Sequence, residues 1–176
     1  TNNGEKAIAL KAGLEAYLRC DHAELFCNGH LALEALLRAM DLHGEVITTP
    51  FTFASTTHAI VRCGLTPVFA DVRPEDCTLN PDAVEALITE KTCAILPVHV
   101  YGCLCDTERF EEISRKHGIP VIYDAAHAFG VKRNGVSAAA MGYASMLSFH
   151  ATKVHIYIHV FCRRLHLADA VPMVLS

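Results

Sequence analysis

The sequence predicts an α/β fold with three layers, α/β/α, in which a mostly parallel sheet lies between two layers of helices. Short apolar segments alternate along the chain with stretches whose apolar residues recur at helical spacing. The apolar segments have no polar face, which indicates strands covered on both sides, as in parallel sheets. With 176 residues the chain has the length of one domain and can bury a hydrophobic core without disulfides.

Two helices flank a short strand at the start of the predicted fold. Apolar residues recur at helical spacing over residues 5 to about 19 and again over residues 31 to 42. Between them, residues 24–27 form a short apolar segment that ends at Asn28-Gly29. This order is typical of a strand that leads through a turn into a helix.

The same alternation continues as far as residue 149. Asn80 before Pro81 is typical of a helix cap followed by proline in the first turn, and Asn134-Gly135 predicts a tight turn. Further strands are predicted at residues 46–49, 67–70, 94–98, 120–123 and 146–149, and helices up to about residue 62, from residue 81 and over residues 106–116.

The composition excludes several classes of function. A net charge of -4 provides no basic surface for nucleic acid or for an anionic membrane. No apolar run reaches the roughly 18 residues that a membrane span needs, and residues 1–6 lack the features of a secretory signal. We therefore expect a cytoplasmic protein that acts on small molecules.

The cysteines indicate neither disulfides nor a metal site. No Cys-x-x-Cys pair occurs, and Cys103 and Cys105 are too close together for the usual zinc spacing. We expect buried thiols that behave as small hydrophobic side chains, and no metal. The motifs of dinucleotide-binding folds, phosphate loops and serine hydrolases are also absent from the sequence.

Polar side chains follow two late strands, at the ends where parallel sheets bind ligands. Asp124 and His127 come after one strand, and Ser148 and Lys153 come at the end of the next. A lysine amine for a Schiff base, a carboxylate facing the ring nitrogen and small polar groups for the phosphate are the groups that pyridoxal phosphate needs. This set therefore predicts a pyridoxal phosphate site.

Earlier residues supply further candidates for the same site. Asn28-Gly29-His30 lies between a strand and a helix, where backbone amides bind phosphate well. Phe53 follows the next strand and offers a ring that can stack on a flat cofactor. Each residue alone also has a structural interpretation: an asparagine-capped turn, a core phenylalanine, an aspartate that caps a turn, a structural histidine.

Taken in order, these motifs resemble the DegT/DnrJ/EryC1/StrS family of sugar aminotransferases, which are fold type I pyridoxal phosphate enzymes. The resemblance runs from about Phe26 to Lys153. Its segments are Phe26-Cys27-Asn28-Gly29, Thr49-Pro50-Phe51-Thr52-Phe53, Pro67-Val68-Phe69-Ala70-Asp71-Val72, Pro97-Val98-His99-Val100-Tyr101-Gly102, Tyr123-Asp124-Ala125-Ala126-His127-Ala128-Phe129-Gly130 and Ser148-Phe149-His150-Ala151-Thr152-Lys153.

The resemblance implies a role for each candidate residue. Lys153 would hold the cofactor as a Schiff base, Asp124 would face the pyridine nitrogen and Phe53 would stack on the ring. Ser148 and the amides near His30 would hold the phosphate, although the family usually has threonine at position 30.

In the same resemblance, His127 takes the place of a family glutamine or histidine near the ring hydroxyl. The family transfers an amino group, generally from glutamate, to the ketone of a nucleotide-linked deoxysugar. Lys153 would then move the proton as general base and acid. Family active sites lie at a homodimer interface, where the partner adds a phosphate contact.

The resemblance also divides the chain. Residues 1–153 are predicted to be an incomplete large cofactor domain, and residues 154–176 to be a tail unlike the family, with the small C-terminal domain absent. The composition of the tail shifts toward histidine, arginine and apolar residues, as a reading-frame change would produce. Within it, residues 156–161 are interpreted as a makeshift edge strand.

Three other functions stay open at this point. The chain can be a catalytically inactive fragment that serves as a folding or interaction module. It can aminate a cyclitol ketone in place of a sugar. It can also resemble the dehydratases of the same superfamily, but these replace the Schiff-base lysine with histidine, and the intact Lys153 favours transamination.

Overall fold

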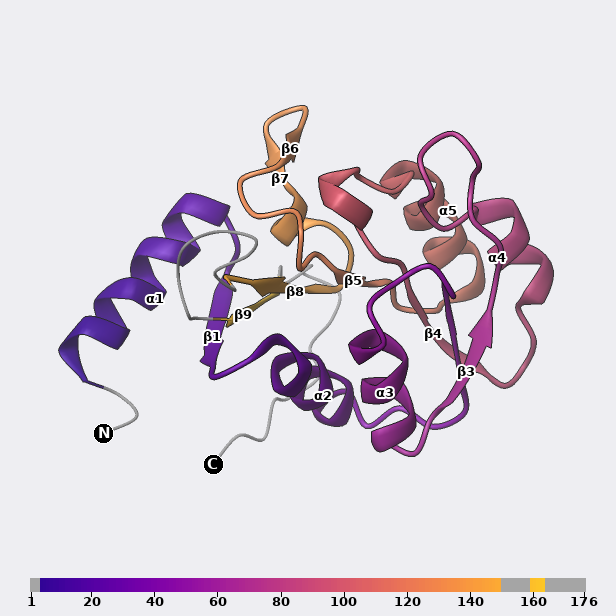
Figure 1. Ribbon diagram of the computed structural model, residues 1–176, viewed down its shortest axis with the longest axis horizontal. Helices are drawn as coiled ribbons and strands as arrows, with labels where there is room; N and C mark the ends of the chain where they lie inside the picture. Colours follow the sequence, from indigo (N-terminus) through magenta and orange to yellow (C-terminus); the bar gives the residue numbers. More distant parts are fainter. Residues whose placement is uncertain (1–3, 150–158, 164–176) are drawn as a thin grey trace.

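The structure is a computed structural model that describes residues 4–149 and the backbone of residues 159–163. Within these residues, five helices of seven to 14 residues alternate with the strands of the sheet (Figure 1). The helices are α1 (Glu5–Leu18), α2 (Gly29–Ala39), α3 (Ser55–Arg62), α4 (Pro81–Leu87) and α5 (Thr107–His117). The strands are β1 (His22–Phe26), β2 (Glu45–Thr48), β3 (Thr66–Phe69), β4 (Thr92–Leu96), β5 (Ile122–Asp124), β8 (Ala144–Ser148) and β9 (His159–Arg163).

Four smaller elements complete the described part of the chain. A hairpin is formed by β6 (Lys132–Arg133) and β7 (Val136–Ser137). Single turns of 3-10 helix, η1 (Val100–Gly102) and η2 (Ala138–Ala140), follow β4 and the hairpin. The predicted tight turn at Asn134-Gly135 is confirmed, because both residues have positive φ angles at the tip of the hairpin.

The strands form a mostly parallel sheet, which confirms the predicted fold class. One group has the order β1-β9-β8-β5 and the other the order β3-β2-β4. Parallel bridges from Ile95 to Val121 and from Val98 to Asp124 join the two groups through β4 and β5. Among the paired strands of this sheet in the described residues, β9 alone runs opposite to the others. Its pairings with β1 and β8 are therefore antiparallel.

The prediction of an edge strand near the end of the chain is wrong for the described part of that segment. Residues 159–163 form β9, which pairs with both β1 and β8 and is therefore interior to the sheet. Backbone hydrogen bonds do not depend on side-chain identity, so these residues can pair with both neighbouring strands whatever their side chains are. Residues 156–158 of the predicted strand lie outside the described residues.

Helices cover both faces of the sheet because its strands are apolar on both sides. In β8, Met146 faces the core formed with α2 and α3, whereas Leu147 faces the core formed with α1. On that second face, α4 and α5 cover the strands further along the sheet through residues such as Val84 and Phe110. The result is the predicted three layers (Figure 1).

Local signals place the helix ends. Asn28 and Asn80 accept hydrogen bonds from amides of the first turns of α2 and α4, and Asp106 does the same for α5. Gly118 ends α5 with a left-handed φ of 67°. Within the described residues, no helix combines the length and the apolar character that a membrane crossing requires.

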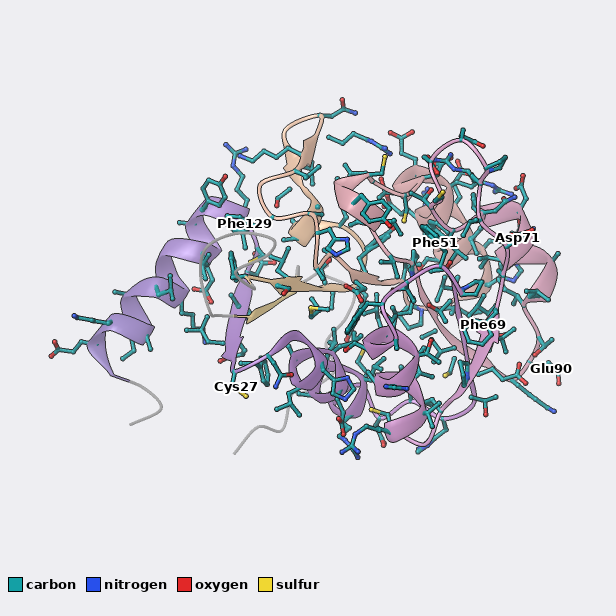
Figure 2. The ribbon with its side chains drawn as sticks, in the orientation of Figure 1. Cys27, Phe51, Phe69, Asp71, Glu90 and Phe129 are labelled. Carbon is teal, nitrogen blue, oxygen red and sulfur yellow. The ribbon has the colours of Figure 1, made fainter. Side chains whose placement is uncertain are left out.

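The cysteines follow the predicted pattern only in part. Cys20 and Cys105 are buried, and burial raises the pKa of the Cys105 thiol to about 12. Cys27 and Cys103 are exposed, so the expectation of buried thiols is wrong for these two. Cys27 lies at the surface beside the start of α2 (Figure 2).

Candidate functional site

The predicted site residues that the structure describes follow the carboxyl ends of parallel strands. Asp124 is the last residue of β5 and Ser148 the last of β8. Asn28 follows β1, and Thr49 directly follows β2. These strands point the same way, so their ends meet at one edge of the sheet. Lys153 lies outside the described residues, so its role stays a prediction.

The Asp124 carboxylate is buried and held in a fixed orientation. The residue is only 5% exposed to solvent. Oδ2 accepts a 2.8 Å hydrogen bond from the Thr56 hydroxyl of α3, and Oδ1 accepts one of 3.1 Å from the Ala126 amide. The Thr56 hydroxyl in turn lies 2.9 Å from that of Thr52. A buried carboxylate with aligned neutral donors is suited to bind a cationic ring nitrogen.

Phe53 exposes its ring to solvent in the turn that precedes α3. The residue is 77% exposed, which excludes the core interpretation. Its carbonyl accepts a 3.1 Å hydrogen bond from the amide of Thr56, so the turn that carries Phe53 is tied to the donor of Asp124. Phe51, in the same turn, is 42% exposed and is labelled in Figure 2. An exposed aromatic face is available for a flat ligand.

His127 lies at the exposed rim of the site. Its Nδ1 accepts a 3.1 Å hydrogen bond from the backbone amide of Tyr101 in η1. The two rings are parallel, with an interplanar angle of 1° and centroids 5.9 Å apart. His127 is therefore held by a turn from another part of the chain, 26 positions earlier.

The start of α2 supplies backbone amides, but its histidine side chain has other partners. Asn28 caps the helix by accepting a 2.8 Å hydrogen bond from Leu31, as the structural interpretation of this turn required. His30 Nδ1 lies 3.0 Å from the Ser55 hydroxyl of α3, and Nε2 lies 3.6 Å from a Glu34 carboxylate oxygen. With the imidazole engaged in this way, the backbone amides of Gly29 and His30 are the donors that this helix start offers to an anion.

Glu34 anchors this part of α2 to α3. Hydrogen bonds from Arg38 and then Arg62 hold the pKa of its carboxyl below the usual range. The carboxylate is nearly buried and stays ionised beside His30. The two helices that flank the site are thereby joined at their starts by the contact of His30 with Ser55, and further along by the ion pair of Glu34 with Arg62.

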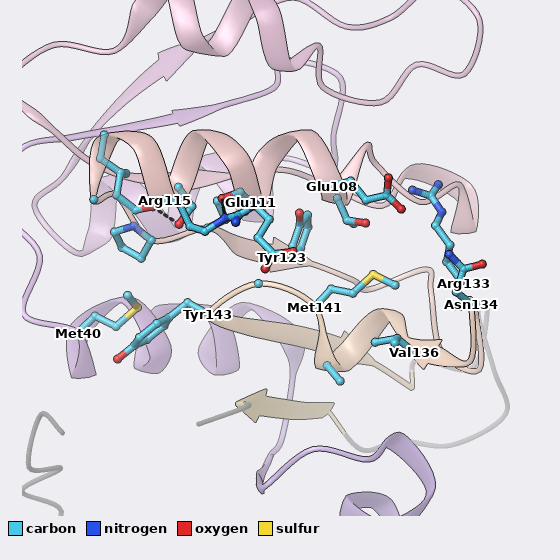
Figure 3. A pocket seen from close by; sticks show the side chains of 18 of the residues that line it. Met40, Glu108, Glu111, Arg115, Tyr123, Arg133, Asn134, Val136, Met141 and Tyr143 are labelled. Carbon is cyan, nitrogen blue, oxygen red and sulfur yellow. Dashed lines mark hydrogen bonds between the residues drawn. The ribbon is translucent and has the colours of Figure 1, made fainter. Parts of the chain in front are cut away.

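A well-defined cavity in the described part of the chain lies away from this edge. It has a volume of about 880 Å³ and lies beside α5 (Figure 3). Its lining includes Pro120 before β5 and Tyr143 before β8, which places it at the amino ends of the strands. The sequence-predicted residues lie at the other edge and do not line this cavity.

Sequence reasoning missed Thr56, Thr52 and the backbone of Tyr101. A signal for Thr56 exists: the buried Ala59 and Ile60 follow it at helical spacing, so Thr56 faces the sheet and its buried hydroxyl needs a partner. No comparable local pattern identifies the Tyr101 amide, because its partner lies 26 positions away.

The donor and acceptor chemistry fits pyridoxal phosphate. A buried carboxylate with oriented donors, an exposed aromatic ring and a histidine surround one edge of the sheet, and helix-start amides adjoin it. These groups match a ring nitrogen, a ring face, a ring hydroxyl and a phosphate. By contrast, the described residues hold no cluster of three or more metal-ligating side chains.

Known proteins match this chain over most of its length. A dTDP-4-amino-4,6-dideoxy-D-glucose transaminase of Shigella dysenteriae is 46% identical over 154 residues, which are 88% of this chain and 42% of that protein. The structure of DesI in the presence of its TDP-sugar product matches with a TM-score of 0.86 and 36% identity, over 92% of this chain and 42% of that one.

A further solved structure and a family model also match this chain, and both are of aminotransferases. The PLP form of a putative sugar aminotransferase from Streptococcus pneumoniae matches with a TM-score of 0.89 and 25% identity, over 96% of this chain and 48% of that one. This chain thus spans less than half the length of each of these proteins. The model of the DegT/DnrJ/EryC1/StrS aminotransferase family matches residues 1–157. The chain therefore belongs to the DegT/DnrJ/EryC1/StrS aminotransferase family.

Proposed function

We propose that this chain forms the cofactor-binding part of a pyridoxal phosphate-dependent aminotransferase that aminates a keto carbon of a nucleotide-linked deoxysugar. The observation that carries the proposal is the buried Asp124 carboxylate, which Thr56 and Ala126 orient. The turn that carries the exposed Phe53 is hydrogen-bonded to the same Thr56. An anion in this position favours a protonated ring nitrogen, and pyridoxal phosphate when bound supplies an electron-poor ring that stabilises negative charge at the reacting carbon.

Each described residue has a separable task in this proposal. Asp124 accepts a hydrogen bond from the ring nitrogen while Thr56 keeps its carboxylate from rotating. Phe53 covers one face of the ring and excludes water from it. Ser148 and the amides at the start of α2 bind the phosphate. Lys153 is proposed to bind the cofactor carbonyl and to move the proton between substrate and cofactor.

The substrate class rests on the similar proteins. The names of the Shigella protein and of the DesI complex specify dTDP- or TDP-linked sugars. We extend to this chain only a nucleotide-linked keto sugar as acceptor and glutamate as the expected amino donor. A homodimer, in which the partner completes the phosphate site, is part of the same proposal.

Absorbance spectroscopy tests the cofactor part of the proposal directly. The chain is mixed with pyridoxal phosphate and freed of excess ligand, and a retained visible band is expected. Lys153→Ala should abolish this band, whereas Lys132→Ala, a lysine in the β6–β7 hairpin, should leave it unchanged. A chain that stays colourless at saturating cofactor contradicts the proposal.

The transfer itself is tested in two half-reactions. Glutamate should convert the bound cofactor to its amine form, which absorbs at shorter wavelength, while an amino acid without a side-chain carboxylate should do so more slowly. Nucleotide-linked keto sugars should then restore the visible band. A chain that binds cofactor but shows neither change is the inactive fragment, and a cyclitol ketone that alone restores the band identifies the other acceptor class.

A further inference from the structure

The contact between Tyr101 and His127 has a consequence for the proton on the imidazole. The backbone N–H of Tyr101 can only donate, so Nδ1 of His127 must accept the 3.1 Å hydrogen bond with its lone pair. A neutral imidazole carries one proton, which then resides on Nε2. The acceptor end of the ring is directed toward η1, and the donor end is the other nitrogen.

We propose that the η1 turn is a positioning device that fixes the tautomer of His127 through the Tyr101 amide, so that Nε2 always carries the proton of the neutral ring. Resting on the proposed function, this makes His127 a hydrogen-bond donor to the ring oxygen of the cofactor. A donor stabilises that oxygen as an anion, whereas an acceptor there would hold a proton on it. Tyr101 acts through His127 and needs no contact with the cofactor.

The turn is anchored to the strand that carries the site. The amide of His99 donates a 2.9 Å hydrogen bond to the Asp124 carbonyl, and Val98 is bridged to Asp124. Within the turn, Gly102 donates to the His99 carbonyl at 3.2 Å. Because these bonds join η1 to the end of β5, the Tyr101 amide and His127 keep their separation.

Two backbone features show that the turn is closely fitted to His127. Tyr101 has φ 52° and ψ 21°, the left-handed region that non-glycine residues seldom occupy. Gly102 has φ 84°, and a Cβ built on it would lie 3.2 Å from the His127 carbonyl oxygen. The backbone of the turn therefore approaches the backbone of His127 closely, and only glycine permits this approach without displacement.

A glutamine offers the same polarity as this histidine tautomer. Its carbonyl oxygen accepts from the Tyr101 amide, and its amide nitrogen donates at the far end. His127→Gln is thus the conservative variant, and His127→Leu the variant of similar size that can neither accept nor donate.

Nitrogen-15 NMR of the cofactor-free chain at alkaline pH tests the inference, with His127→Gln used to assign the ring signals. We expect an unprotonated Nδ1, a protonated Nε2 and a measurable coupling through the hydrogen bond between the Tyr101 amide nitrogen and Nδ1. Protonated Nδ1, or rapid exchange between the two tautomers, would overturn the inference. This result does not depend on cofactor binding or on the variants that follow.

The role of the turn is tested with paired glycine variants. Gly102→Ala should push η1 away from His127 and produce a mixture of tautomers. Gly64→Ala imposes a similar backbone strain, at φ 77°, where a Cβ meets nothing within 4 Å, and should leave the tautomer unchanged. A folded Gly102→Ala chain with the unaltered ring signals would show that the turn does not select the tautomer. If this variant does not fold, the through-bond coupling in the unaltered chain decides.

The loaded chain supplies a second readout. The position of the visible band, and its change between pH 6 and 9, should be nearly the same in His127→Gln as in the unaltered chain and should shift in His127→Leu. Equal spectra for all three would contradict a donor at this position. A failure to bind pyridoxal phosphate would refute the proposed function. The NMR result on the cofactor-free chain would still show which nitrogen of His127 carries the proton.

Discussion

Two histidines lie next to the η1 turn in different surroundings. His99 lies in the protein interior and His127 at the exposed rim of the site. Each histidine accepts a backbone N–H at Nδ1, His99 from Cys105 at 3.2 Å and His127 from Tyr101 at 3.1 Å. Each ring also lies nearly parallel to a tyrosine ring, that of His99 against Tyr123 at 4.5 Å. The hydrogen-bond pattern is shared, and the burial is not.

Burial decides what each histidine can do. His99 is fully buried, and this burial, followed by the charge of Arg133, lowers its pKa from 6.5 to about 3. Its Nε2 is buried and makes no hydrogen bond to any side chain or backbone group in the described residues. His127 is exposed at the carboxyl edge of the sheet. The same local geometry therefore gives a structural residue inside and a candidate functional residue outside.

Alanine at the two positions should separate these roles most clearly. His99→Ala removes a buried ring stacked on Tyr123 and leaves the Cys105 amide without its acceptor, which we expect to cost about 3 kcal/mol of unfolding free energy. His127→Ala should cost less than about 1 kcal/mol, because the side chain is exposed. Urea unfolding followed by circular dichroism measures both. Equal losses would remove the distinction between interior and rim.

The pH dependence of stability sharpens the same contrast. The unfolded chain protonates His99 near pH 6.5, whereas the folded chain keeps it neutral down to about pH 3. The unfolded state thus binds more protons in this window, so stability rises with pH there and is lost as the pH falls through it. The slope from one such group is about 1.4 kcal/mol per pH unit.

The control for this prediction is His99→Gln, which cannot titrate. Carboxylates also contribute to the slope in the acid range, since hydrogen bonds from Lys116 and His117 lower the pKa of Glu85 to about 2. Unfolding free energies measured from pH 4 to 7 should therefore depend on pH in both chains, with the slope smaller in His99→Gln. Identical slopes would mean that His99 is protonated in the folded state.

A pair of threonines repeats the comparison beside Asp124. Thr56 is fully buried and donates to the Asp124 carboxylate, whereas Thr52 is partly exposed and contacts only the hydroxyl of Thr56 among the bonds described here. Thr56→Val should cost about 1–2 kcal/mol because it leaves a buried carboxylate oxygen without this donor. Thr52→Val should cost less than about 0.5 kcal/mol. Thermal unfolding of both variants, loaded and free of cofactor, distinguishes them.

The smallest effect on stability is expected at Phe53. Because this side chain is 77% exposed, Phe53→Ala should change the unfolding free energy by less than about 0.5 kcal/mol. Loss of one stacking partner should nevertheless weaken pyridoxal phosphate binding by about tenfold, as measured by absorbance titration. Phe69→Ala, which removes another half-exposed phenylalanine at the end of β3, should leave the affinity unchanged. A stability loss without an affinity loss would assign Phe53 to packing.

The sequence alone determined the alternation of helices and strands and the positions where each strand ends. Periodic apolar residues, helix caps and turn residues act within about four positions, so they are readable without the fold. They place Asp124 and Ser148 at strand ends, and Asn28 at the cap of α2. The family motifs added the roles expected of these residues.

Only the tertiary structure decided which of these groups meet. The Thr56 hydroxyl reaches Asp124 across 68 positions, and the Tyr101 amide reaches His127 across 26. The place of β9 between β1 and β8, and the difference in burial between His99 and His127, were likewise unreadable from composition or spacing. Such pairings depend on how the layers pack against each other, which distant residues settle together and no local pattern encodes.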